Sequence, residues 1–170
     1  MKKIYLAGGC FWGVEHFLGL IDGVEKTTVG YANSDIPSPS YEDLKARRSS
    51  ASESVEVVYD EEKISLDEIL HLFFLIIDPT ILDRQGHDVG HQYRTGIYYE
   101  NEEDKDTAER ALSALQEEYE AKIVTELLPL DNFTPAEEYH QDYLYKNPEG
   151  YCHVDRRMFE LARQYKRKEK

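Results

Sequence analysis

Short apolar runs, bounded by glycine, proline and charged residues, predict five β-strands. In one of them Val55, Val57 and Tyr59 occupy every second position, which is typical of a strand with one buried face. Gly8 and Gly9 interrupt the chain after the first run and end that strand. The predicted strands are residues 3–7, 24–31, 54–59, 95–99 and 123–128.

Apolar residues spaced three and four apart predict helices between these strands. Residues 11–20 show this spacing, and so do residues 66–77, which follow a capping box formed by Ser65 and Glu68. A second capping box, Thr134 to Glu137 with proline at the first helical position, predicts a helix to about residue 145. The other predicted helices are residues 41–47, the charged stretch 101–122, and a segment from Asp155 into the charged run 166–170.

Three segments are predicted to be loops: residues 32–40, 78–94 and 146–153. The second is long and polar, and a loop of that length inside a compact domain is often functional. The chain shows no internal repeat and no linker. The pattern therefore predicts one α+β domain over residues 1–170.

Composition narrows the class of protein. The chain has 170 residues, enough to bury a core without a metal or disulfide, and its mean hydropathy is -0.64. Its net charge of -14 repels phosphate backbones, so nucleic acid is not an expected partner. We interpret the basic run 166–168 as favourable charge at a helix C-terminus.

Two cysteines, Cys10 and Cys152, are too few for a disulfide-rich secreted scaffold. The N-terminus lacks the pattern of a signal peptide, and no run of about 18 apolar residues would span a membrane. We therefore expect a cytoplasmic protein that does not bind membranes. In a reducing compartment the two cysteines are either inert or redox-active.

The segment around Cys10 carries the most chemical information. The predicted strand and helix place this thiol at a helix N-terminus, where free amides and the helix dipole favour the nucleophilic thiolate. Gly8 and Gly9 permit a tight turn, and Trp12 follows two residues later, where an aromatic side chain can wall a small apolar pocket. The alternative is an inert cysteine buried among aromatic residues.

The sequence Ala7 to Gly13, AGGCFWG, resembles the signature of A-type peptide methionine sulfoxide reductases. Further segments resemble the family in the same order, so the resemblance covers roughly residues 3–154. It implies a two-layer α/β plait with a mixed sheet and flanking helices, and no bound cofactor or metal. The matching segments are residues 29–32, 41, 55–60, 78–79, 86–94, 139–144 and 146–153.

The resemblance also implies an activity, the thiol-dependent reduction of methionine S-sulfoxide, protein-bound or free, in protein repair under oxidative stress. Cys10 would attack the sulfoxide sulfur and Glu53 would protonate the oxygen, which requires a desolvated carboxyl group with a raised pKa. Two tyrosine hydroxyls would hydrogen-bond that oxygen, and aromatic side chains would hold the S-methyl group. The remaining matched residues are Tyr41 and Tyr93 for the hydroxyls, Phe11 and Trp12 for the aromatics, Asp88 for substrate and pocket, and His140 with Tyr143 beside them.

Cys152 matches the family's resolving position. It would condense with a sulfenic acid on Cys10 to give a disulfide, which thioredoxin would reduce, because the chain has no third cysteine to act as a relay. If Cys152 stays buried, an external thiol would resolve the sulfenic acid instead. A metal site at His87 and His91 is not expected, because neighbouring glycines argue against a helix there.

The chain departs from the family pattern over residues 45–52, just before Glu53. Glu56 is the competing carboxylate, but a three-residue shift would spoil the match over 55–60. Two other functions remain open. One is a non-catalytic redox switch built on the two cysteines, and the other is a hydrolase that pairs Cys10 with His140.

Overall fold

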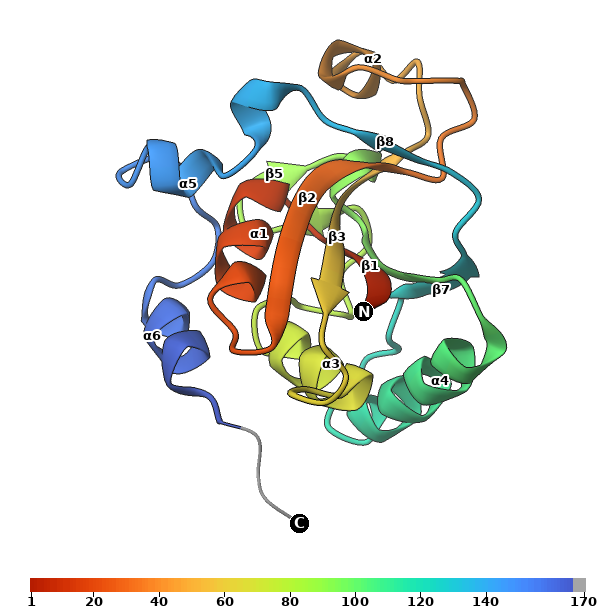
Figure 1. The fold of residues 1–170 in the computed structure, drawn as a ribbon. Helices are drawn as coiled ribbons and strands as arrows, with labels where there is room; N and C mark the ends of the chain where they lie inside the picture. The colour runs from red at the N-terminus through yellow and green to blue at the C-terminus, as the bar shows by residue number, and fades with distance from the viewer. Residues whose placement is uncertain (167–170) are drawn as a thin grey trace.

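The computed structural model describes residues 1–166, and a six-stranded sheet forms its centre (Figure 1). The strand order is β7-β6-β1-β3-β2-β8, and every neighbouring pair is antiparallel except β6 and β7, which are parallel. The sheet is therefore mixed, as predicted. Its strands are β1 (Lys2–Gly8), β2 (Val24–Ala32), β3 (Ser52–Tyr59), β6 (Thr95–Tyr99), β7 (Glu126–Pro129) and β8 (Phe133–Pro135).

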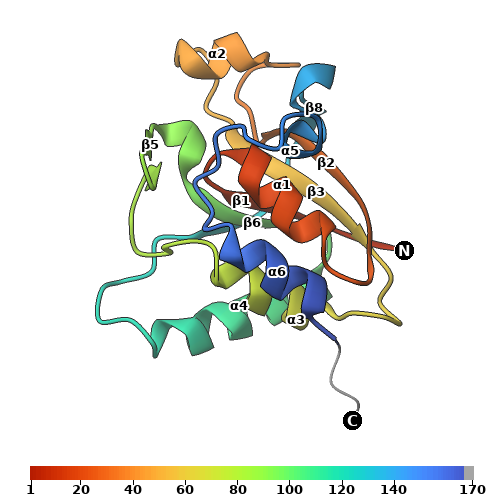
Figure 2. The ribbon, with the colours of Figure 1, turned by 90° about the vertical axis from the view of Figure 1, so that its left-hand side faces the viewer.

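Helices cover one face of this sheet. In α1 (Phe11–Gly19) and α3 (Leu66–Phe74), apolar side chains at helical spacing join those of the strands in one core cluster. Figure 2 shows α1 lying across the sheet with α6 (Arg157–Gln164) beside it. The opposite face holds a smaller cluster, Tyr5, Ala7, Ala32 and Tyr98, packed against Leu130 and Phe133. The predicted arrangement of a mixed sheet with flanking helices is confirmed.

Most predicted elements are present with shifted ends. The helix predicted over 66–77 ends at Phe74, and the one predicted over 101–122 is α4 (Glu102–Gln116). Gln116 accounts for the early end of α4, because its side chain accepts a hydrogen bond from Ile123 N at 2.9 Å and donates to Ala121 O at 3.0 Å. The chain after the helix is thus held in an irregular path, and β7 begins three residues later than predicted.

The helix predicted over 134–145 is wrong. Thr134 lies in β8, opposite Tyr31 of β2, and the Glu137 carboxylate accepts a hydrogen bond from the Tyr31 hydroxyl at 2.7 Å instead of closing a capping box. Gln141 adds a second long-range tie through the backbone of Val29, at 3.0 and 2.9 Å. These contacts leave a 3-10 turn η2 (Glu138–His140) and a single helical turn α5 (Tyr143–Lys146).

The long segment 78–94 contains a small hairpin, β4 (Arg84–Gln85) with β5 (Asp88–Val89), followed by the 3-10 turn η1 (His91–Tyr93). The short helix α2 (Tyr41–Lys45) begins after a capping box on Ser40. Helix α6 ends two residues before Lys166, and the rest of the charged run, 167–170, lies outside the described residues. Among residues 1–166, no helix is long and apolar enough to cross a membrane.

Candidate active site

Cys10 is the N-cap residue of α1, directly after the turn that ends β1. The turn requires glycine at position 9, where φ is 90° and an added Cβ would lie 2.7 Å from the Cβ of Gln85. The Cys10 side chain is only 7% exposed. The sulfur is thus held at the start of the helix and opens onto a site that is largely shielded from water.

The charge state of Cys10 differs from the sequence-based expectation. Burial is the largest effect and raises the pKa of the thiol well above its usual value, and the charges of Glu53 and Asp88 raise it further. The backbone N–H of Trp12, in the first turn of α1, lowers the pKa but is outweighed. At rest, therefore, Cys10 is a thiol and not the thiolate that its helix position alone would favour.

Glu53, on β3, faces Cys10 and is 1% exposed. One carboxyl oxygen accepts a hydrogen bond from the Gln92 side chain at 2.8 Å, and the other a long one from the backbone of Phe11 at 3.4 Å. Burial raises the pKa of Glu53 to about 8, against these two hydrogen bonds, which lower it. The carboxyl group is thus protonated at neutral pH. Sequence reasoning missed Gln92, which carried no signal beyond its place in the long polar loop.

Glu56, the competing carboxylate, lies elsewhere. It accepts a hydrogen bond from the Tyr5 hydroxyl at 2.9 Å and is half-buried, three residues further along β3. Side chains three apart on a strand point to opposite faces of the sheet. The structure therefore brings Glu53, and not Glu56, to the cysteine.

Tyr41, the first residue of α2, and Tyr93, the last of η1, converge on the same site. Their hydroxyl groups lie close enough that Tyr93 lowers the pKa of Tyr41. Burial, followed by the charge of Glu53, raises the pKa of Tyr41 to about 12 and that of Tyr93 above its usual value. Both hydroxyls therefore keep their protons and can donate hydrogen bonds.

An aromatic wall stands beside Cys10. The indole ring of Trp12 stacks on Tyr143 with ring centroids 3.7 Å apart and an interplanar angle of 9°, and its Nε1 donates to Nδ1 of His140 at 3.0 Å. His140 is fully buried, also packs against the rings of Phe11 and Tyr41, and has its pKa lowered by burial. The imidazole is thus neutral, and its Nδ1 is engaged by Trp12. This arrangement disfavours a hydrolase in which His140 would serve Cys10 as a base.

Cys152 lies against the first turn of α1. Its sulfur is 3.0 Å from the point where a Cβ at Gly13 would stand, and its thiol donates to the carbonyl of Val154 at 3.3 Å. Both cysteines are free thiols, and Cys152 is partly buried. Glycine at position 13 thus lets the second sulfur approach the helix that begins at Cys10, a role that the sequence alone did not reveal.

Two neighbours of Cys152 complete this side of the site. Tyr151 donates its hydroxyl hydrogen to Asp88 at 2.8 Å. His153 donates from Nε2 to the carbonyl of Gly8 at 2.9 Å. Both contacts bind the C-terminal segment to the loops around Cys10. Sequence reasoning had singled out Asp88 but not Tyr151 or His153.

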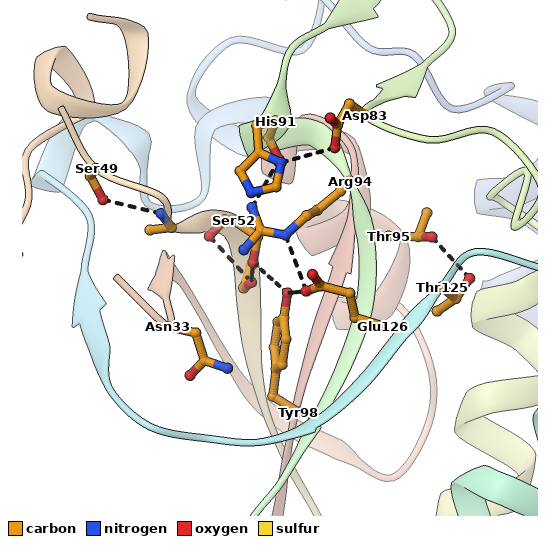
Figure 3. Close-up of polar contacts among 12 residues, drawn as sticks. Asn33, Ser49, Ser52, Asp83, His91, Arg94, Thr95, Tyr98, Thr125 and Glu126 are labelled. Atoms are coloured by element: carbon orange, nitrogen blue, oxygen red, sulfur yellow. Dashed lines mark hydrogen bonds and ion pairs between the residues drawn. The ribbon is translucent and has the colours of Figure 1, made fainter. Parts of the chain in front are cut away.

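Arg94 fixes the end of η1 against the sheet (Figure 3). Its buried guanidinium lies 3.1 Å from the carboxylate of Glu126 on β7, and Nη1 donates to the carbonyl of His91 at 2.9 Å. The Tyr98 hydroxyl donates to the same Glu126 carboxylate at 2.8 Å, and His91 pairs with Asp83 at 3.1 Å. These contacts hold the turn that presents Gln92 and Tyr93 to the site.

The site contains side-chain types that can bind metals, but they are not arranged as a metal centre. Among residues 1–166, no group of three or more histidine, cysteine, aspartate or glutamate side chains is arranged to hold a metal ion. The site consists instead of a buried thiol, a protonated carboxyl group, two hydroxyl donors and an aromatic wall. Such a set suits a neutral, polarisable substrate that must accept a proton.

Comparison with known proteins assigns the chain to a family. The sequence profile described as "Peptide methionine sulfoxide reductase" matches residues 2–170. The chain belongs to the peptide methionine sulfoxide reductase family. Peptide methionine sulfoxide reductase MsrA of Clostridium perfringens is 56% identical over 154 residues, which cover 91% of this chain and 98% of that protein. The MsrA of Alkaliphilus metalliredigens is 54% identical over 155 residues, with the same coverage.

Solved structures of the peptide methionine sulfoxide reductase family share this fold. The crystal structure of reduced Mxr1 from Saccharomyces cerevisiae is 40% identical, with a TM-score of 0.84, and the match covers 89% of this chain and 88% of that chain. Methionine sulfoxide reductase A of Corynebacterium diphtheriae is 37% identical, with a TM-score of 0.80, over 89% of this chain and 77% of that chain. Mxr1 in complex with Trx2 matches with 31% identity and a TM-score of 0.61, over 84% of each chain.

The segment that departs from the family pattern packs tightly before Glu53. Ser52 is fully buried, and its hydroxyl shares hydrogen bonds with the hydroxyls of Ser54 and Tyr98, both at 2.9 Å. Ser49, also buried, pairs with Ser34 at 2.7 Å. These hydroxyl contacts satisfy the polar groups of the segment, so the departure leaves Glu53 buried at the site.

Proposed function

We propose that this chain reduces methionine S-sulfoxide, protein-bound or free, to methionine. The observation that carries the proposal is the protonated Glu53 beside the Cys10 thiol, in a site that excludes water. A sulfoxide oxygen leaves only when it is protonated, so a carboxyl group that keeps its proton at neutral pH supplies what the reaction needs. In the cell this activity would repair oxidised proteins.

The reaction balances as a two-electron exchange. The sulfur of Cys10 attacks the sulfoxide sulfur, the S–O bond breaks, and oxygen ends on Cys10 as a sulfenic acid while methionine leaves. Glu53 gives its proton to the oxygen and is recharged by the proton that Cys10 loses. Its oxygen with the long contact to Phe11 is the one free to carry that proton, because the other is held by Gln92 at 2.8 Å.

Substrate binding follows from the other side chains. Tyr41 and Tyr93 keep their protons and would donate hydrogen bonds to the sulfoxide oxygen. The wall of Phe11 and Trp12 would enclose the S-methyl group. His140 and Tyr143 hold Trp12 by hydrogen bond and stacking, and Asp88 would help to fix the pocket through Tyr151.

Cys152 would resolve the sulfenic acid. Its thiol attacks Cys10, a disulfide forms and water leaves, so that a dithiol is needed to restore both cysteines. Mxr1 forms a complex with Trx2, which supports thioredoxin as the reductant for this chain as well. An external thiol that acts directly on Cys10 is the alternative. Location in the reducing cytoplasm stays a prediction.

The deciding experiment is a single turnover. The reduced protein is mixed with one equivalent of a peptide that contains the S epimer of methionine sulfoxide, and methionine and free thiols are measured without added reductant. One methionine per protein with loss of both thiols supports the reductase and the Cys10–Cys152 relay. Methionine with the Cys152 thiol intact assigns resolution to an external thiol.

Absence of methionine from folded, reduced protein would overturn the proposal and favour the redox switch. Matched variants sharpen the test. Glu53→Gln is expected to lower the rate by roughly 10²–10⁴, the usual contribution of a general acid. Glu56→Gln removes a carboxylate from the same strand without touching the site and is expected to react as the unmodified chain does.

A further inference from the structure

A cavity adjoins the site and has no part in the proposed chemistry. Its volume is about 620 Å³, and it lies between residues 35–50 and the segment that contains the β4–β5 hairpin and η1. Figure 2 shows α2 and this hairpin at the same upper side of the molecule. Gln92 lines the cavity and also donates to Glu53, and the Lys45 ammonium, another lining group, lies 5.4 Å from the centre of the Tyr41 ring. The cavity thus opens beside the site's own side chains.

Three basic side chains line this cavity: Lys45, Arg47 and Arg84. All three are exposed, and among the described residues none has a carboxylate within 4 Å. The chain has 34 acidic and 20 basic residues, and these three cations have no carboxylate partner in the described part of the chain, although Arg84 donates from Nε to the carbonyl of Gly86 at 3.1 Å. They are available for charges that come from outside the chain.

The two carboxylates of the cavity already have partners. Asp35 accepts a hydrogen bond from the backbone of Ser50 at 2.8 Å, and Asp83 pairs with His91 at 3.1 Å. These hydrogen bonds hold both carboxylates in place but do not remove their negative charges. Three cations against two carboxylates leave the lining of the cavity with a net positive charge.

Apolar side chains give the cavity a surface that a peptide can contact. Leu82 is 65% exposed and Val89 is 71% exposed, both on the hairpin side, while Leu44 of α2 is buried beneath. A surface with net positive charge is complementary to a negatively charged polypeptide, and the exposed apolar side chains add contact area. Free methionine sulfoxide bound at Cys10 is too small to extend across this cavity. Only a polypeptide substrate could therefore contact it.

The chain's own departure from the family pattern lies here. Lys45 and Arg47 belong to residues 45–52, the segment with no match to the common pattern. Arg47 follows Ala46, the C-cap residue of α2, where its φ of 60° ends the helix in the common left-handed conformation, and its side chain lines the cavity.

We propose that this cavity binds acidic residues that flank the methionine sulfoxide of a polypeptide substrate. The proposal rests on the reductase function above and adds a substrate class to it: methionines in acidic sequence. Lys45, Arg47 and Arg84 attract aspartate and glutamate side chains, and Leu82 with Val89 packs against the peptide between them. The charges act mainly by lowering the KM for such substrates.

The test compares two short peptides, each with a central S epimer of methionine sulfoxide. One is flanked on both sides by aspartate and glutamate, the other by asparagine and glutamine of the same shape. At low salt, kcat/KM is expected to be about tenfold higher for the acidic peptide, since three exposed ion pairs each contribute a small factor. At about 0.5 M salt the difference is expected to disappear, because such charges are screened.

Charge variants locate the effect. Lys45→Gln/Arg47→Gln/Arg84→Gln is expected to reduce the ratio between the two peptides to about one. The matched control, Lys26→Gln/Arg110→Gln/Lys122→Gln, removes three exposed cations that do not line the cavity and is expected to keep the tenfold ratio. The proposal would be overturned if the unmodified chain had the same kcat/KM for both peptides. It would also be overturned if the cavity variant and the control variant lost the preference for the acidic peptide to the same extent.

Binding distinguishes this proposal from the reductase function. The acidic peptide with unoxidised methionine and a fluorescent label is titrated with the protein at low salt, where no chemistry occurs. Binding that the cavity variant loses and the control variant keeps supports the cavity even if no sulfoxide is reduced. Turnover of both peptides at equal rates, without salt-dependent binding, supports the reductase and refutes the cavity.

Discussion

Replacing Glu53 by glutamine removes the ionisable group on which the proposed chemistry depends and keeps its shape. The carboxyl is 1% exposed, and burial raises its pKa from 4.5 to about 8. At about 1.4 kcal/mol for each tenfold change in an equilibrium constant, this corresponds to a preference of roughly 5 kcal/mol for the neutral form in the fold. Glutamine is neutral at every pH and escapes that penalty.

The direction of the pH dependence of stability follows from the ionisation of Glu53 in the folded and in the unfolded chain. Below pH 4.5 the carboxyl is protonated whether the chain is folded or unfolded, and its contribution to stability is complete. As the pH rises towards 8, the unfolded chain releases the proton while the folded chain retains it, so stability is lost. Between pH 5 and pH 8 the unmodified chain should lose roughly 3 kcal/mol that Glu53→Gln does not lose.

Urea unfolding of both proteins at pH 5, 6, 7 and 8, with the cysteines kept reduced, measures this difference. The free energy of unfolding of Glu53→Gln relative to the unmodified chain is expected to rise steadily across the series. Parallel curves at all four pH values would refute the reasoning, because they would mean that Glu53 ionises alike in the folded and unfolded chain. Glu56→Gln serves as the control for loss of a carboxylate from the same strand.

Three further changes have defined outcomes. Gln92→Leu removes the hydrogen bond that lowers the pKa of Glu53, so the alkaline limb of the kcat/KM profile should move to higher pH; an unchanged profile would contradict this. Gly13→Ala places a Cβ 3.0 Å from the sulfur of Cys152. In a single turnover the oxidation of the Cys152 thiol should therefore become about tenfold slower, while the rate of methionine release stays unchanged. Equal thiol kinetics would count against it. Burial raises the pKa of Glu15 from 4.5 to about 7, so the unmodified chain loses stability as the pH rises from about 4.5 to 7. Relative to the unmodified chain, Glu15→Gln should gain roughly 2–3 kcal/mol between pH 5 and pH 8, measured by Tm at both pH values. A difference that is the same at both pH values would refute this.

Local patterns predicted the elements whose stability is local. Apolar spacing located α1 and α3, and the capping box at Ser65 is present with both of its hydrogen bonds. The error over 134–145 has the opposite origin. The side chains of Glu137 and Gln141 bind residues more than a hundred positions away, and nothing in the local sequence announces such partners.

The candidate site, too, could be predicted only in part from the local sequence. The family resemblance located Cys10 and Glu53, and their convergence follows from the register that sets β3 beside β1 and β2. The state of the thiol could not be inferred from its helix position, because burial depends on the whole fold. Gln92 and Gly13 were missed for a related reason: an amide in a polar loop and a glycine in a helix gain meaning only from the group placed opposite them.

Helix α1 positions two parts of the candidate site at once. It carries Cys10 and Trp12, and one turn later Glu15 accepts a hydrogen bond from the backbone of Asp142 at 2.8 Å, where φ is 52°. The nucleophile and the aromatic wall are therefore carried by one helix, which Glu15 ties to Asp142. A displacement of α1 would therefore move the Cys10 sulfur and the Trp12 indole together.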